Sequence, residues 1–196
     1  MHLDKIKNNE HFAMNVIHQS KNSKSWYAIY VNSRHEKCVY NKLKRKNIES
    51  SLPLTSVIRQ WSDRKKKVEI PLFRGYVFVN INIQNEKLDV LQTEGVVKFV
   101  SFGGKIVDIP DKQMHWIHRL LASSNIEYEQ EFTVGVQVDV IFGPFKGLRG
   151  LVKQERTETR LVVWFDTIMQ GVSIAIAPSC LKETKKKIDL PLKTSY

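Results

Sequence analysis

Residues 65–81 read KKKVEIPLFRGYVFVNI: three lysines lead into a Pro-Leu-Phe-Arg-Gly-Tyr turn, which is followed by an apolar, aromatic segment. The last seven residues, GYVFVNI, are rich in β-branched and aromatic side chains, which is typical of a strand. Two interpretations of the rings are open. Phe73, Tyr76 and Phe78 are core residues beside a solvated basic tip, or they form a surface that binds a partner.

Upstream of this stretch, the pattern predicts a strand and then a helix. WYAIYVN at 26–32 has aromatic residues on both faces, as in an interior strand. Ser33 and Glu36 have the spacing of an S-x-x-E capping box, and good helix formers continue to about Asn47. We therefore expect a helix with one packed face and one strongly cationic face.

The remaining elements of the first part follow from alternation and turn residues. The segments at 54–61 and 75–81 are predicted strands, with the polar run SDRKKK between them as a hairpin tip. A short helix is expected at 85–94, a strand at 96–102 and a helix at 110–121. This order predicts an α+β protein whose first domain has the ferredoxin-like, split βαβ arrangement.

A change of composition marks a second domain. The segment at 122–132, ASSNIEYEQEF, is small, polar and acidic, which predicts a linker. Four β-branched runs separated by turn residues follow it, and these predict a small β-barrel. The predicted boundaries are a mobile leader at 1–25, domains at 26–121 and 133–183, and a basic tail at 184–196.

The charge of the chain indicates a polyanionic partner. Thirty-one Lys and Arg side chains face 20 Asp and Glu side chains, so the net charge is +11 and the pI is about 9.6. Residues 1–121 hold 21 of the basic and 11 of the acidic side chains. The basic character therefore belongs mainly to the first domain.

Several function classes find no support in the sequence. Cys38 and Cys180 are far apart, so neither a disulfide framework nor a zinc site is expected. His115 and His118 share a helix without an acidic or thiol partner, which disfavours a metal pair. We find no catalytic triad, phosphate loop or signal peptide, and therefore expect a cytoplasmic protein that is not an enzyme and has no cofactor.

Five motifs, taken together, resemble the NusG family of transcription elongation and antitermination factors. They are WYAIYV, PLFRGYVFV, GVVKFVSFGGK, IPDKQ and GPFKGLRG, and the resemblance covers about residues 26–183. The last of them, at 143–150, is similar to the KOW motif. The resemblance implies a ferredoxin-like NusG N-terminal (NGN) domain at 26–121, a flexible linker, and a five-stranded KOW β-barrel.

The resemblance also implies a partner for the aromatic residues. In the family, an apolar patch of the first domain binds the clamp-helix coiled coil of RNA polymerase. The matching positions here are Tyr30, Phe73, Tyr76 and Phe78. Most members have proline where this chain has Arg74. The arginine either adds a polar contact at the rim of the patch or alters the turn.

A nucleic-acid surface is implied as well, because the family places its first helix beside upstream DNA and the displaced non-template strand. Such contacts are largely non-specific and weaken with salt. The residues expected at this surface are Asn32, His35, Lys42, Arg45 and Lys46, with Arg64, Lys65, Lys66 and Lys67 at the hairpin tip.

Ile168 and Met169 lie between two strands of the second domain, where an apolar pair either packs locally or docks a partner. The family uses this place to bind a small-subunit ribosomal protein, which couples transcription to translation, or the Rho terminator. The mobile leader, the basic tail and Arg74 favour a specialised, RfaH-like paralogue. The His-Thr-Thr contact of such paralogues does not match NEKLDVL, and the valine-rich strands predict a barrel that does not refold as helices.

The implied function is that of a monomeric factor that binds elongating RNA polymerase and suppresses pausing or termination, without a membrane partner. A second interpretation is a ribosome-associated RNA-binding protein, because KOW barrels and basic split βαβ domains occur there too. That alternative predicts binding to ribosomal RNA and has no need of Phe73 and Tyr76.

Overall fold

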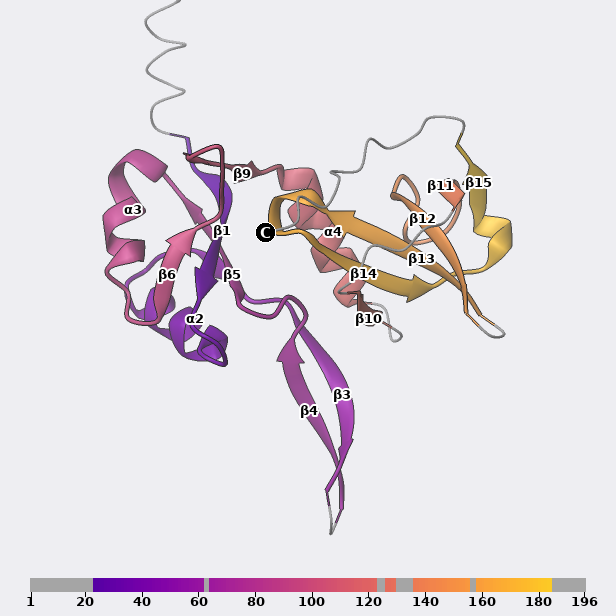
Figure 1. The fold of residues 1–196 in the computed structure, drawn as a ribbon, viewed down its shortest axis with the longest axis horizontal. Coiled ribbons are helices and arrows are strands. Elements are labelled where there is room, and N and C mark those ends of the chain that lie inside the picture. Colours follow the sequence, from indigo (N-terminus) through magenta and orange to yellow (C-terminus); the bar gives the residue numbers. More distant parts are fainter. Residues whose placement is uncertain (1–22, 62–63, 123–125, 130–135, 156–157, 185–196) are drawn as a thin grey trace, which may run out of the picture. The chain divides into compact units, whose positions relative to one another are not determined.

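The computed structural model describes residues 23–61, 64–122, 126–129, 136–155 and 158–184, and these form two compact units (Figure 1). The first unit contains the described residues up to Leu52 together with Arg74–Asp111. The second contains Pro53–Phe73 and the described residues from Lys112 onward. The predicted leader and basic tail lie outside the described ranges, apart from their inner ends.

The first unit is a mixed sheet-and-helix structure. Its elements in chain order are β1 (Ser25–Val31), α2 (Glu36–Arg45), β2 (Ser50–Ser51), β5 (Tyr76–Ile81), α3 (Ile83–Leu91), β6 (Val96–Phe99), β7 (Ser101–Phe102), β8 (Lys105–Ile106) and β9 (Asp108–Ile109).

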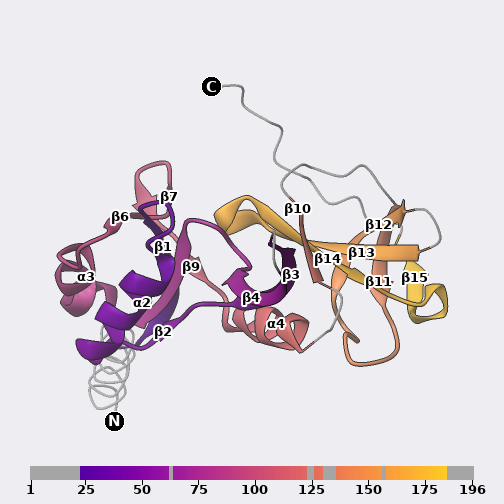
Figure 2. The same cartoon turned by 90° about the horizontal axis from the view of Figure 1, so that it is seen from below.

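Strand β1 is the centre of this unit. It pairs antiparallel with β5 along one edge and with β6 and β9 along the other, in a sheet of order β2-β5-β1-β6. Ala28, Ile29 and Val31 are fully buried, which agrees with the interior strand predicted at 26–32. Figure 2 shows α2 beside β2, and Val39 and Leu43 of this helix are buried in the same core as Ile29.

The predicted capping box at Ser33 is wrong. The N-cap of α2 is His35, and it makes no side-chain cap, because Arg34 adopts a φ of 63° and the helix begins only at Glu36. Glu36 therefore stands at the first helical position, not at the third, which a capping box requires. Its carboxylate is 7% exposed and accepts a hydrogen bond from the Gly75 N–H at 2.8 Å, which ties α2 to the start of β5.

The second unit contains a hairpin, one α-helix and a six-stranded sheet. Its elements are β3 (Leu54–Gln60), β4 (Lys65–Pro71), α4 (Asp111–Leu121, which begins at the end of the first unit), β10 (Ile126–Glu129), β11 (Val136–Val140), β12 (Arg149–Glu155), β13 (Glu158–Phe165), the 3₁₀ turn η1 (Asp166–Ile168), β14 (Gln170–Ala175), the 3₁₀ turn η2 (Pro178–Cys180) and β15 (Leu181–Glu183).

The hairpin differs from the sequence prediction. Strand β3 pairs with β4, from Leu54 opposite Pro71 to Gln60 opposite Lys65, and not with the segment at 75–81. The lysines expected at a tip are thus strand residues. The outer part of the ribbon is exposed, so lysines are tolerated there. The Trp61 N–H donates to the Arg64 carbonyl at 2.8 Å and closes the end of the ladder.

The sheet of the second unit is antiparallel, in the order β10-β14-β13-β12-β11-β15. Strand β10 lies inside the segment predicted as a linker, where Ile126 pairs with Ile174. Between β12 and β13 the backbones approach so closely that a Cβ at Gly150 would meet the Val162 carbonyl oxygen. Among the described residues, three α-helices accompany predominant strands and confirm the mixed class, while the split βαβ topology and the closed five-stranded barrel stay predictions.

We expect Glu36→Leu to lower the free energy of unfolding by about 1–3 kcal/mol, because the Gly75 N–H loses its acceptor. Ser33→Ala should change it by less than about 0.5 kcal/mol, since Ser33 caps nothing. Chemical denaturation measures both. Glu36→Gln keeps a side-chain oxygen and is the matched control, and a greater loss from Ser33→Ala than from Glu36→Leu would contradict this assignment.

Candidate functional site

An aromatic pair lies on one face of the β1–β5 ladder. Tyr30 is directly opposite Tyr76, and their ring centroids are 5.5 Å apart at an interplanar angle of 68°. Side chains two residues apart on a strand share a face, so Phe78 lies on the same side as Tyr76. Tyr30 is 42% exposed and Tyr76 half-buried, whereas Phe78 is only 1% exposed. The accessible part of the predicted patch in this unit is therefore the tyrosine pair.

Gly75 fixes the position of this pair. It has a φ of +81°, and a Cβ there would lie 3.0 Å from Cε2 of Tyr30. Its N–H donates to Glu36, and its carbonyl accepts from the Val31 N–H at 2.9 Å. The glycine thus lets the backbone pass beneath the Tyr30 ring while both of its polar groups are satisfied.

Phe73 belongs to the second unit and is buried there. It is 1% exposed, and its ring packs edge-on against Phe165 with the centroids 5.3 Å apart and an interplanar angle of 79°. A partner that uses the Phe73 ring must therefore replace Phe165.

The predicted nucleic-acid residues near α2 have different surroundings. Asn32 and His35 are exposed before the helix, and His35 Nδ1 lies 3.0 Å from the Ser33 carbonyl. Lys46 donates through Nζ to the Asp89 carbonyl and to Thr93 Oγ1, both at 2.9 Å, so it links α2 to the end of α3. Its role in the structure is that of a tether between helices.

Lys42 makes an ion pair, with its Nζ 2.7 Å from Glu94 Oε2. The hydrogen bond from Lys42 lowers the pKa of Glu94, and the same hydrogen bond raises the pKa of Lys42. Since Glu94 is highly exposed, a polyanion can displace it at little cost in buried area. Arg45, in the last turn of α2, is exposed as well.

The hairpin carries the other predicted cations. Arg64, Lys65, Lys66 and Lys67 are all exposed. The last three lie in β4 and point to alternating faces of the ribbon.

The two residues of the predicted docking pair in the second unit, Ile168 and Met169, differ in exposure. Ile168 ends the turn η1 and is 3% exposed, whereas Met169 is 43% exposed and has a φ of 51°. Phe142, which is 64% exposed, was not predicted from the sequence as an accessible apolar residue of this unit. Of the predicted pair, only Met169 offers an accessible apolar side chain.

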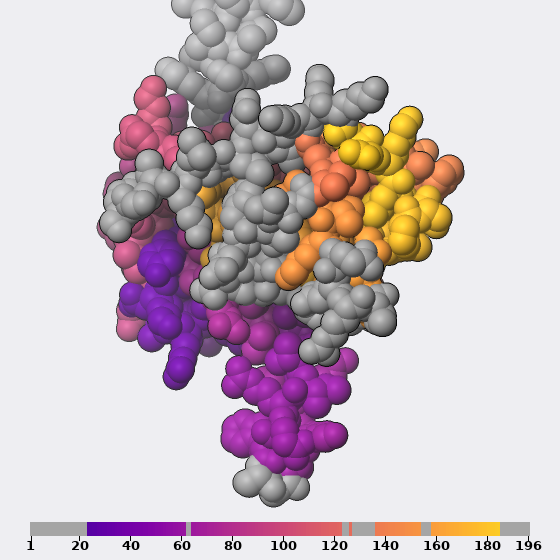
Figure 3. Space-filling model, turned by 45° about the vertical axis from the view of Figure 1, so that its right-hand side comes forward, coloured from indigo at the N-terminus to yellow at the C-terminus, as the bar shows by residue number. Residues whose placement is uncertain are grey.

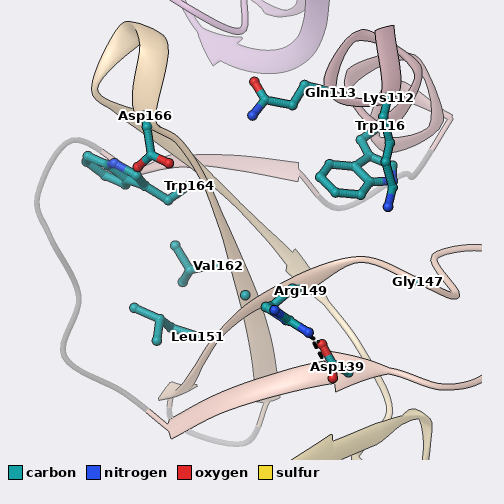
Figure 4. A pocket seen from close by; sticks show the side chains of 11 residues that line it. Lys112, Gln113, Trp116, Asp139, Gly147, Arg149, Leu151, Val162, Trp164 and Asp166 are labelled. Carbon is teal, nitrogen blue, oxygen red and sulfur yellow. Dashed lines mark hydrogen bonds and ion pairs between the residues drawn. The ribbon is translucent and has the colours of Figure 1, made fainter. Parts of the chain in front are cut away.

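A pocket of about 430 Å³ in the second unit was not expected from the sequence. Figure 4 shows Lys112 and Trp116 of α4 on one side, with Trp164 and Asp166 on another. Lys112 Nζ lies 5.0 Å from the centre of the Trp116 ring, Arg149 Nε donates to Asp139 at 2.7 Å, and desolvation raises the pKa of Asp166. The further lining residues are Gln113, Gly147, Gly150, Leu151 and Val162. The two cations of the lining, Lys112 and Arg149, are balanced by Asp139 and Asp166. The pocket therefore lacks the excess positive charge that would favour a polyanion.

The described ranges also bear on membrane and metal binding. None of their helices has the length and apolar character needed to cross a membrane. They hold no group of three or more His, Cys, Asp or Glu side chains placed to bind a metal ion.

Comparison with known proteins identifies the class. Residues 24–118 match the family model described as transcription termination factor nusG. The transcription termination/antitermination protein NusG of Pseudomonas aeruginosa is 28% identical over 151 residues, which cover 69% of this chain and 84% of the relative. Its Staphylococcus aureus counterpart is 28% identical over 150 residues, covering 69% and 82%.

A solved structure is similar as well. A structure described as "Domain interaction in Thermotoga maritima NusG" aligns with a TM-score of 0.53 and 27% identity, over 82% of this chain and 97% of that one. These matches support membership of the NusG family, whose relatives here are named transcription termination/antitermination proteins.

Gly75→Ala is expected to destabilise the protein more than Gly104→Ala does. Both glycines have a similar positive φ, +81° and +76°, but nothing lies within 4 Å of a Cβ at Gly104. The backbone strain of about 1–2 kcal/mol is therefore common to both, and the difference measures the contact with Tyr30. Thermal unfolding and NMR shifts of the Tyr30 ring report it, and equal losses with an unmoved ring would contradict the close approach.

Proposed function

We propose that this protein binds RNA polymerase during elongation and suppresses pausing or termination. The observation that supports this best is the Tyr30–Tyr76 pair, which lies partly exposed on a rigid ladder in a member of the NusG family. Rigid rings bury a large area at little cost in side-chain entropy, so such a pair is suited to anchor a helical partner. The partner that we assign to it is the clamp-helix coiled coil of the polymerase.

The predicted patch residues contribute unequally. Phe78 is on the same face of β5 as Tyr76 but only 1% exposed, so we assign it a supporting role and not a direct contact. Phe73 becomes available only if its edge-on contact with Phe165 opens. Such an aromatic contact is worth about 0.5–1.5 kcal/mol beyond the area that it buries. Loss of this contact would therefore accompany polymerase binding through Phe73, and a domain interaction is described for the Thermotoga maritima relative.

The cations of α2 and of the hairpin are proposed to contact upstream DNA or the non-template strand. Lys42 and Arg45 are the strongest candidates on the helix, because Lys46 is already engaged by α3. Arg64, Lys65, Lys66 and Lys67 would add phosphate contacts from the ribbon, with Asn32 and His35 at the start of the helix.

Met169 is the proposed contact for a second partner, either a small-subunit ribosomal protein or Rho, with Ile168 packed beneath it. We assign the chain to the specialised, RfaH-like paralogues on the exposed Arg74, which stands at a position where most members have proline. The leader and basic tail that also favour this assignment lie outside the described residues.

Tyr76→Ala is expected to weaken binding to core RNA polymerase by more than about tenfold, in line with the loss of an aromatic anchor. The measurement is a titration with purified polymerase, after circular dichroism has shown that the variant is folded. Phe102→Ala removes another exposed ring of the first unit, 52% accessible, and is the control that should bind normally.

Binding of Tyr76→Ala at wild-type affinity would contradict the polymerase assignment. A pull-down from lysate separates the rival interpretation, since recovery of ribosomal RNA without polymerase subunits would favour the ribosome-associated protein.

Neutralising Lys42 and Arg45 together should weaken binding to bubble DNA and flatten its salt dependence. Each phosphate contact that is lost lowers the slope of log K against log salt by about 0.7 for single strands. Because Lys42 is paired with Glu94, the variant Glu94→Gln should do the opposite and strengthen binding. Unchanged affinity and slope in the Lys42→Gln/Arg45→Gln variant would exclude α2 from the nucleic-acid surface.

A further inference from the structure

The outer part of the β3–β4 ribbon carries an exposed tryptophan between cations. Arg59 and Lys66 are directly opposite each other, and Trp61 is two residues beyond Arg59 along the chain. Since side chains alternate along a strand, Arg59, Lys66 and Trp61 lie on one face of the ribbon. Trp61 is about 6.7 Å from Arg59 along the chain direction, at two residues' spacing. We call these three residues the ribbon face.

The exposure of this face is unusual for its composition. Trp61 is 56% exposed, and Arg59 and Lys66 are exposed as well. Figure 3 shows the outer ribbon, in purple, projecting beyond the other described parts of the second unit on the face that is drawn. With more than half of its surface in water, Trp61 contributes less burial to folding than a packed tryptophan would, so packing alone explains its place only in part.

The charges of the ribbon also work against its stability. Arg59 and Lys66 are like charges at directly opposed positions, an arrangement that destabilises a pair of strands. Residues 59–67 contain five cations and a single acidic residue, Asp63. A two-stranded ribbon is marginally stable even without such repulsion. An anionic ligand that lies across the ribbon face would relieve it.

Backbone geometry leaves the indole ring available. The Trp61 N–H donates to the Arg64 carbonyl at 2.8 Å, and its carbonyl lies 3.2 Å from the Gln60 amide nitrogen. These bonds hold the main chain at Trp61, whose side chain is 56% exposed. An accessible indole beside two cations is an arrangement that suits single-stranded nucleic acids, with the ring stacked on a base and the cations on phosphates.

We propose that the ribbon face binds single-stranded nucleic acid, with Trp61 stacked on an unpaired base and Arg59 and Lys66 contacting the flanking phosphates. A single strand is favoured over a duplex because the bases of a duplex are stacked on one another and offer no free face to an indole. The proposal deepens the proposed function, since it rests on the protein acting beside the displaced strand, and it names the residue that selects unpaired bases.

The test compares binding of the full chain to a fluorescent 12-nucleotide single-stranded DNA and to the corresponding duplex. Trp61→Leu is expected to weaken binding to the single strand about tenfold, as expected for the loss of one stacked base, and to leave duplex binding within about twofold. Trp61→Phe keeps an aromatic ring and should recover most of the affinity. Ile58→Ala is the matched control, because it removes a side chain that is 74% exposed on the opposite face.

Salt dependence separates stacking from charge. Trp61→Leu should leave the slope of log K against log salt unchanged, whereas Arg59→Gln/Lys66→Gln should lower it by about 1.4, at about 0.7 for each phosphate contact. Amide NMR shifts of Val57 and Val68, a directly opposed pair of the ribbon, verify that each variant keeps its hairpin.

Unchanged single-strand binding by Trp61→Leu would overturn the proposal, and so would equal losses for single strand and duplex. Binding of Trp61→Phe no better than Trp61→Leu would exclude stacking. Polymerase affinity measured without nucleic acid distinguishes this result from a failure of the proposed function, since Trp61→Leu should bind polymerase normally whatever the oligonucleotides show.

Discussion

The pairing of β1 along both of its edges is the constraint on which the first unit depends. Because β5 lies on one side and β6 and β9 lie on the other, β1 cannot shift its register without disrupting two ladders. The register places Tyr30 opposite Tyr76 and brings Gly75 beneath the Tyr30 ring. An exposed aromatic pair is thereby held at a fixed position by strands that also carry the buried residues Ile29, Val77 and Val79.

Charge and aromatic surface are distributed over different elements. In the first unit, Lys42 of α2 is held by an ion pair and Lys46, at the end of that helix, by a carbonyl contact. In the second, the ribbon carries Arg59 and Lys66 as directly opposed like charges. The contacts of Lys42 and Lys46 stabilise the first unit, and Arg45 is exposed away from its packed face. The opposed cations of the ribbon form a cationic surface but lower the stability of the ribbon.

Local sequence patterns predicted where most helices and strands lie, but not which strands pair with each other. The helix predicted at 110–121 is confirmed as α4, because helical periodicity and helix-starting residues reside in neighbouring positions. The pairing of β3 with β4 was missed, since three consecutive lysines do not resemble a strand. The burial of Phe73 and Phe78, in contrast to the exposed Tyr30, could not be predicted either, because alternation gives the face of a side chain and not what covers it.

The base of the β3–β4 excursion is closed by the Leu72 N–H, which donates to the Pro53 carbonyl at 2.8 Å. The chain leaves and returns at almost one point, so paired residues could be inserted in or removed from the ribbon without moving either anchor. Each added pair would extend it by about 3.4 Å, and the entropy of loop closure changes only slowly with length. The ribbon is thus the part of this chain whose reach can diverge between relatives with the least disturbance to the core.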